Sequence, residues 1–125
     1  MDQIPFQPKD ASVIFKSNSV KGRAWIADIS QDEKKNPVIL YTKSPAEANH
    51  EYWNARYTDK GWVNVEICDS GKHFPQTPEG VIERKSHYFG GLTMHPNNSN
   101  VVYRSKIVNG VFEIERWELN SKNGQ

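Results

Sequence analysis

The sequence contains one cysteine, few leucines and no long apolar run. Cys68 has no second cysteine with which to form an intrachain disulfide, and alone it cannot complete a zinc site, so neither device is expected to hold the fold. No stretch approaches the roughly 18 to 20 apolar residues of a membrane-spanning helix. Met1–Asp10 also lacks the basic start and apolar run of a signal peptide. We therefore expect a domain that is stabilised by packing and has no membrane segment.

An excess of charge of one sign is also lacking. The 125 residues include 16 Lys and Arg against 15 Asp and Glu, a net charge of +1, and these charges are spread along the chain. This balance argues against a nucleic-acid-binding arm and against a polybasic membrane patch. The length suits one domain and is too short for two. No Gly-rich phosphate loop, H-E-x-x-H or G-x-S-x-G motif is present, which excludes the NTPase, zincin and serine-hydrolase patterns.

The apolar residues that are present favour strands. Val and Ile number 10 and 9, whereas Leu and Ala number 3 and 6, and β-branched residues suit the pleated surface of a sheet. Only 36% of the residues are hydrophobic and the mean hydropathy is −0.78. The composition therefore predicts an all-β protein with a thin core.

Seven strands in two antiparallel meanders are predicted, without a helix longer than about two turns. Asn109-Gly110 is a strong hairpin signal, because both residues tolerate positive φ. The meanders repeat at an interval of about 65 residues, as four-stranded blades do in β-propellers. We expect one blade over about 23–68, a long rim loop over 69–87, an incomplete next blade over about 88–119 and an outer strand at Ala11–Phe15. The predicted strands are 23–30, 37–43, 50–57, 62–68, 88–95, 100–107 and 111–119.

Several stretches also resemble a known family. Arg-Ala-Trp-Ile-Ala-Asp-Ile at 23–29, His-Glu-Tyr-Trp-Asn-Ala-Arg-Tyr at 50–57 and, above all, the Tyr-Phe-Gly-Gly to Val-Tyr-Arg stretch at 88–104 resemble BNR/Asp-box propeller proteins of polysaccharide degradation. The closest resemblance, over about residues 12–125, is to the seven-bladed propeller lyases that cleave ulvan and related rhamnose–glucuronate polymers. The tail at 121–125 is similar to the start of a degenerate Asp box.

This resemblance implies a partial β-propeller of about 1.75 blades, cut from a longer secreted or periplasmic protein. Its expected partners are an anionic polysaccharide and either the missing propeller blades or a second copy of the chain. Isolated, such a piece would expose sheet edges and apolar faces, so we expect it to associate or to be poorly stable.

One rim of the sheets is where we expect chemistry. In an up-and-down blade the start of the first strand, the end of the second, the start of the third and the end of the fourth lie on the same side. The 19 residues of the 69–87 loop also reach this rim, and a loop of that length is more often functional or disordered than inert.

The resemblance implies β-elimination at a uronate. Arg104 would neutralise the uronate carboxylate through a bidentate fork, Tyr88 would remove the proton next to it, and His50 would act as partner base or acid. Tyr88 and Arg104 share a face only if the Pro96–Asn100 turn sets an even register or if Gly90-Gly91 forms a bulge. The expected substrate-binding residues are Arg23, His87, Gly90 and Gly91.

Other interpretations stay open. No cofactor is expected, although Cys68, His73 and His87 share the rim and could join a structural metal with ligands from elsewhere. The four tryptophans suit packing between blades better than sugar platforms. A non-catalytic glycan-binding propeller piece and a small β-sheet interaction module are the alternatives to the lyase. A sialidase-type hydrolase would need an arginine triad that two blades cannot provide.

Overall fold

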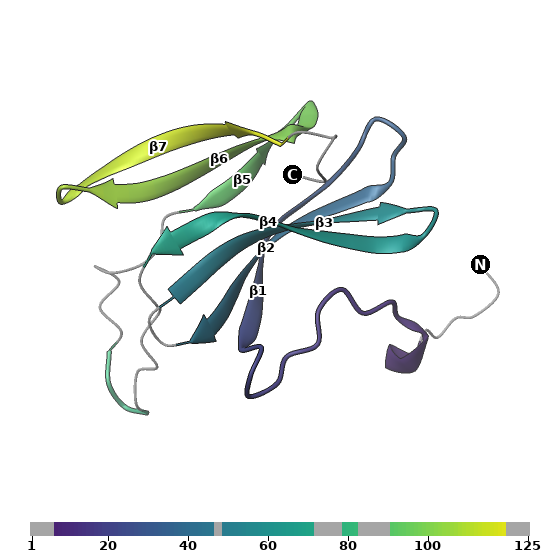
Figure 1. Cartoon of the computed structure of the whole chain (residues 1–125), viewed down its shortest axis with the longest axis horizontal. Coiled ribbons are helices and arrows are strands. Elements are labelled where there is room, and N and C mark those ends of the chain that lie inside the picture. Colours follow the sequence, from purple (N-terminus) through teal and green to yellow (C-terminus); the bar gives the residue numbers. More distant parts are fainter. Residues whose placement is uncertain (1–6, 47–48, 72–78, 83–90, 120–125) are drawn as a thin grey trace.

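The computed structural model describes residues 7–46, 49–71, 79–82 and 91–119, which form two antiparallel sheets (Figure 1). The first sheet has the order β1-β2-β3-β4 and the second the order β5-β6-β7, so both are meanders of neighbouring strands. The only helix among the described residues is a short 3-10 turn at Pro8–Asp10. The predicted all-β class is confirmed. The strands are β1 (Arg23–Gln31), β2 (Pro37–Ala46), β3 (Asn49–Thr58), β4 (Gly61–Gly71), β5 (Leu92–His95), β6 (Asn98–Val108) and β7 (Val111–Glu118).

Several predicted bounds differ from the structure. Strand β2 runs on to Ala46 instead of ending at Lys43, β5 begins at Leu92, and β6 begins at Asn98. Strand β4 runs on to Gly71, so the rim loop begins later than residue 69. The outer strand predicted at Ala11–Phe15 is wrong, because this segment joins no sheet ladder. The carbonyl of Ile14 instead accepts a hydrogen bond of 3.2 Å from the side-chain amide of Asn64 in β4. The segment therefore lies across a face of the sheet and does not extend its edge.

Short polar turns fix the register of the hairpins. Asn109 and Gly110 have φ values of 51° and 81°, as the hairpin signal predicts. In the β1–β2 turn the carboxylate of Asp32 accepts the backbone N–H groups of Lys34 and Asn36 at 2.9 and 2.8 Å. These contacts satisfy turn amides that the ladders leave unpaired.

The hydrophobic core lies between the two sheets. In β2, Val38 and Leu40 are buried and alternate with Ile39, which faces the opposite side. Figure 1 shows the three-stranded sheet lying over the four-stranded one. The cluster is small, in agreement with the low hydropathy. Its members are Val38, Leu40, Tyr52, Leu92, Met94, Val102 and Leu119.

Among the described residues, three charged side chains join the sheets around this core. Oδ2 of Asp28 in β1 accepts hydrogen bonds of 2.8 Å from the backbone N–H of Met94 and from the Thr93 hydroxyl. Arg56 in β3 donates through Nη2 to the carbonyl of Ser99 at 2.6 Å. The third is Arg104 in β6, described below. A thin core is thus supplemented by charge-assisted hydrogen bonds, which are stronger than neutral ones.

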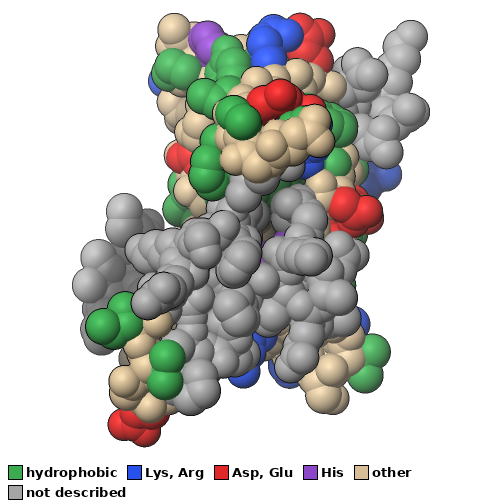
Figure 2. All heavy atoms as spheres, turned by 90° about the vertical axis from the view of Figure 1, so that its left-hand side faces the viewer, with side chains coloured by type: hydrophobic (Ala, Val, Ile, Leu, Met, Phe, Trp, Pro, Cys, Tyr) green, Lys and Arg blue, Asp and Glu red, His purple; other side chains and the backbone are tan. Residues whose placement is uncertain are grey.

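The outer faces of both sheets expose apolar side chains. Ile26 and Ile29 of β1 are 61% and 62% exposed, and Phe112 and Ile114 of β7 are 59% and 78% exposed. In the side view of Figure 2, hydrophobic, acidic and basic side chains of the described residues are interspersed. No helix among the described residues is long and apolar enough to cross a membrane.

Candidate functional site

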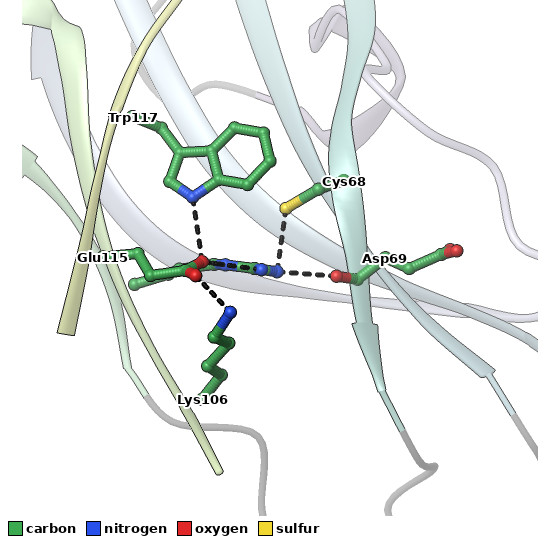
Figure 3. Close-up of polar contacts among 6 residues, drawn as sticks. Cys68, Asp69, Lys106, Glu115 and Trp117 are labelled. Carbon is green, nitrogen blue, oxygen red and sulfur yellow. Dashed lines mark hydrogen bonds and ion pairs between the residues drawn. The ribbon is translucent and has the colours of Figure 1, made fainter. Parts of the chain in front are cut away.

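Arg104 occupies the end of the interface between the sheets. Its side chain is 11% exposed, and both Nε and Nη2 lie 2.8 Å from Oε2 of Glu115, the residue directly opposite on β7. On its other side Nη1 donates to the carbonyl of Asp69 at 2.6 Å and to Sγ of Cys68 at 3.0 Å. Figure 3 shows this bridge between the two sheets. Most of the donors of the guanidinium therefore have partners within the chain.

The Glu115 carboxylate is the centre of this cluster. It also pairs with Nζ of Lys106 and accepts a hydrogen bond of 3.2 Å from the indole N–H of Trp117, which lie on opposite sides of it in Figure 3. Hydrogen bonds from Lys106, Arg104 and Trp117 lower its pKa to about 2. Cζ of Arg104 lies 5.0 Å from the centre of the Trp117 ring, within cation–π range. We call Arg104, Glu115, Lys106, Trp117, Cys68 and Asp69 the Arg104 cluster.

Cys68 in this cluster is held as a thiol. Burial raises the pKa of Cys68, against the nearby positive charge of Arg104, which lowers it. A thiol is a weaker nucleophile and metal ligand than a thiolate. Among the described residues no group of three or more His, Cys, Asp or Glu could hold a metal ion. His73 and His87, the other expected participants in a metal site, lie outside the described residues.

His50 and Arg23 lie at the same end of the first sheet. His50, the second residue of β3, pairs with Gly71 and is 2% exposed, and Arg23 begins β1 opposite Ser44. Strand alternation places His50 on the face of Tyr52, which belongs to the inter-sheet core. Tyr52 is paired with Cys68, a member of the Arg104 cluster. The structure thus brings His50 and Arg104 to the same end of the interface.

The pairing of β5 with β6 bears on whether Tyr88 and Arg104 share a face of the second sheet. Leu92 pairs with Arg104 and Met94 with Val102, so the described part of β5 and β6 has the even register. Gly91, which is exposed, accepts a backbone hydrogen bond of 3.0 Å from Ser105, and a Cβ at Gly91 would meet no atom within 4 Å. Tyr88, His87 and Gly90 lie outside the described residues, so their predicted roles stay predictions.

A second polar site lies on the opposite face of the first sheet. A cavity of about 420 Å³ opens between β2, β3 and the N-terminal segment. Sequence analysis missed it, because the segment has no periodic pattern that places it over the strands. We call it the lysine pocket and define it by Phe15, Lys16, Lys21, Lys43, Glu51 and Trp53.

Comparison with known proteins does not assign this chain to a family. No family model, curated protein or solved structure matches this chain. The fold defines an all-β chain built of a four-stranded meander and a three-stranded sheet.

Proposed function

We propose that this chain is part of a carbohydrate-active β-propeller that cleaves uronate-containing polysaccharides by β-elimination. The observation that carries the proposal is the carboxylate that lies in the fork of Arg104. This arginine is oriented by Asp69, Cys68 and Trp117, so its preferred ligand is a carboxylate in a fixed plane. A uronate carboxylate has the same shape and charge as the Glu115 side chain.

The propeller part of the proposal is supported by the arrangement of the sheets. Two consecutive antiparallel meanders lie face to face, and each exposes apolar side chains on its outer face. In a propeller each blade packs both faces against neighbouring blades. Additional blades would cover Ile26 and Ile29 on one side and Phe112 and Ile114 on the other.

The reaction divides among three side chains. With the uronate carboxylate neutralised by Arg104, Tyr88 removes the proton from the neighbouring ring carbon. The electron pair of that C–H bond forms a carbon–carbon double bond, and the bond to the glycosidic oxygen breaks. The oxygen leaves with its electron pair and takes up a proton, for which His50 is the partner acid. No water is consumed, and one product carries an unsaturated uronate.

For a uronate to enter, Glu115 has to leave the fork. Lys106 and the Trp117 indole already contact its carboxylate, so Glu115 has partners outside the fork. The exchange replaces one carboxylate by another and leaves no guanidinium without a counter-ion. This makes the occupied arginine compatible with a substrate site.

The test uses the closed parent protein and an ulvan-like polymer. Elimination creates an unsaturated uronate that absorbs in the ultraviolet, whereas hydrolysis does not. Tyr88→Phe should lower the rate by roughly 10²- to 10⁴-fold with little change in binding. Arg104→Lys should also be severe, because an ammonium cannot form the bidentate fork. Arg116→Lys, which alters an exposed arginine paired with Glu118, is the matched control. Cleavage without the absorbance would contradict the proposal, as would full activity of Tyr88→Phe.

A second candidate is a glycan-binding propeller without chemistry. It is favoured by the contacts of Arg104, whose Nε, Nη1 and Nη2 atoms are all engaged within the chain. The ultraviolet absorbance of the product separates the two candidates, and Glu115→Gln tests whether Arg104 receives a uronate. If Arg104 receives substrate, removing the competing charge should tighten uronate binding. If Arg104 is structural only, Glu115→Gln should lower stability and leave uronate affinity unchanged.

A further inference from the structure

The lysine pocket is held in place by the segment that precedes β1. Asn18 forms a bridge with Gly22, whose N–H donates to the Asn18 carbonyl at 3.0 Å. The side-chain oxygen of Asn18 accepts the backbone N–H of Lys21 at 2.7 Å. At the other end of the segment, Asn64 holds the Ile14 carbonyl. Lys16 and Lys21 are therefore carried by a segment that is tied to the sheet at both ends.

One cation of the pocket, Lys43, has aromatic neighbours. Nζ of Lys43 lies 3.2 Å from the centre of the Trp53 ring and 4.8 Å from that of Phe15. Among the described residues, none of the ion pairs involves Lys16, Lys21 or Lys43. The pocket thus sets three positive charges against the one carboxylate in its lining, Glu51, on a chain whose net charge is +1.

The acidic residue of the pocket, Glu51, is hydrogen-bonded to Trp53 and forms no ion pair with a lysine among the described residues. Glu51 is the cross-strand partner of Lys43, yet its Oε2 accepts the indole N–H of Trp53 at 2.9 Å. This bond orients the indole and leaves the ammonium group on the ring face. Burial lowers the pKa of Lys43, Glu51 and Glu66 raise it, and Lys21 lowers it further. An additional anion in the pocket would compensate the clustered positive charge.

The size of the cavity indicates the class of ligand. At about 420 Å³ it exceeds the roughly 30 Å³ that one water occupies in the liquid and falls within the range of small-molecule sites. Its walls combine the rings of Phe15 and Trp53 with lysines and with the polar side chain of Asn64. Aromatic surface beside directed polar groups suits a ring that has an apolar face and polar substituents.

We propose that the lysine pocket binds one residue of an anionic saccharide, with its carboxylate or sulfate held by Lys16, Lys21 and the Lys43 ammonium that lies over the Trp53 ring. This inference rests on the proposed function and adds a second carbohydrate subsite to it. The pocket opens at the rim end of the outer face of the four-stranded sheet, where Lys43, Pro45 and Glu51 line it, and not over Ile26 and Ile29, which a neighbouring blade would cover. In this proposal the lysine pocket binds substrate without taking part in the elimination.

The test follows the indole N–H signals of the ¹⁵N-labelled chain by NMR, with the Trp53 signal assigned from Trp53→Phe. The probes are a uronate tetrasaccharide, a sulfated disaccharide, neutral maltotetraose and polyglutamate. We expect the uronate or sulfated probe to shift the Trp53 signal in a saturable way, and maltotetraose to leave it unchanged. Which anionic probe binds more tightly identifies the acid group.

Substitutions test the role of the lysines. Lys16→Gln combined with Lys21→Gln should weaken the anionic saccharide roughly threefold to twentyfold, since exposed charge pairs each contribute modestly. Lys34→Gln combined with Lys60→Gln removes the same charge from two exposed turns and should leave affinity unchanged. Equal weakening by both double variants would overturn the proposal.

Three further results would overturn it: no Trp53 shift with either anionic saccharide, equal binding of maltotetraose, or polyglutamate binding as tight as that of the saccharides. Failure here is distinguishable from failure of the lyase proposal. The pocket is measured by binding to this chain, whereas the lyase is measured by the ultraviolet absorbance of its product.

Discussion

Replacing Arg56 by methionine should remove one of the three charged links between the sheets. The half-buried Arg56 donates from Nη2 to the Ser99 carbonyl at 2.6 Å and from Nε to the Asn54 side-chain oxygen at 3.0 Å. Both acceptors belong to buried residues. Methionine retains an unbranched apolar stem of comparable reach, so Arg56→Met chiefly removes the hydrogen bonds.

The size of the effect follows from the two acceptors left behind. A buried polar group that loses its partner costs about 1–3 kcal/mol. With two such groups, Arg56→Met should lower the free energy of unfolding by about 2–6 kcal/mol. Domains are stable by only about 5–15 kcal/mol in total. The loss would therefore be a large part of the stability of a chain with so small a core.

The assay is urea denaturation followed by tryptophan fluorescence, at one low protein concentration. Adding a second substitution, Asn54→Leu, should raise the free energy of unfolding of Arg56→Met by about 1–2 kcal/mol. The reason is that leucine replaces the buried amide that lost its hydrogen-bond donor. Nδ2 of Asn54 already has no hydrogen-bond partner among the described residues. Arg116→Met, on the outer face of β7, is the control and should change stability little. If Arg56→Met is no more destabilising than this control, the proposed role of Arg56 in joining the sheets is wrong.

Three further predictions concern the outer surfaces and the entry to β1. The isolated chain should self-associate with rising concentration, and Phe112→Thr with Ile114→Thr should reduce this in sedimentation; a monomer at every concentration would contradict it. Burial raises the pKa of Tyr41 to about 12, which favours the protonated, folded form, so stability should fall between the ordinary tyrosine pKa of about 10 and pH 12. Tyr41→Phe should flatten that slope in alkaline titrations of unfolding, and an unchanged slope would refute the assignment. Gly22→Ala should strongly lower the melting temperature, because a Cβ there would lie 1.7 Å from the Ser44 carbonyl oxygen and φ is +74°; wild-type melting would show that the segment can move aside.

The strands could be predicted because their signals are local. Period-two alternation in β2 to β4 and the Asn109-Gly110 turn each act within about ten residues. The Arg104–Glu115 pair was accessible by the same reasoning, since a two-residue turn at Asn109-Gly110 sets these residues opposite each other. The role predicted for Arg104 included a substrate carboxylate but not the carboxylate of Glu115 opposite it.

The contacts between the sheets and the lysine pocket could not be predicted in this way. Arg56 and Ser99 are 43 residues apart, and Asn64 and Ile14 are 50 apart. Nothing in the local pattern of either partner specifies the other, because such contacts depend on how two completed sheets or a coil segment settle on a surface. The wrongly predicted strand at Ala11–Phe15 has the same origin, since a short apolar run suits both an edge strand and a segment that covers a face.

The small core gives a physical reason why an arginine that joins the sheets would also suit the proposed uronate site. With seven clustered apolar residues between the sheets, charged links supplement the packing, and such links have to be oriented to be effective. Asp69, Cys68 and Trp117 orient the Arg104 guanidinium whether its fork holds Glu115 or another carboxylate. A ligand carboxylate would therefore meet an arginine whose ordering is already complete, and the entropy cost of binding falls accordingly. On this basis, the structural contacts of Arg104 support its proposed role in binding a uronate carboxylate.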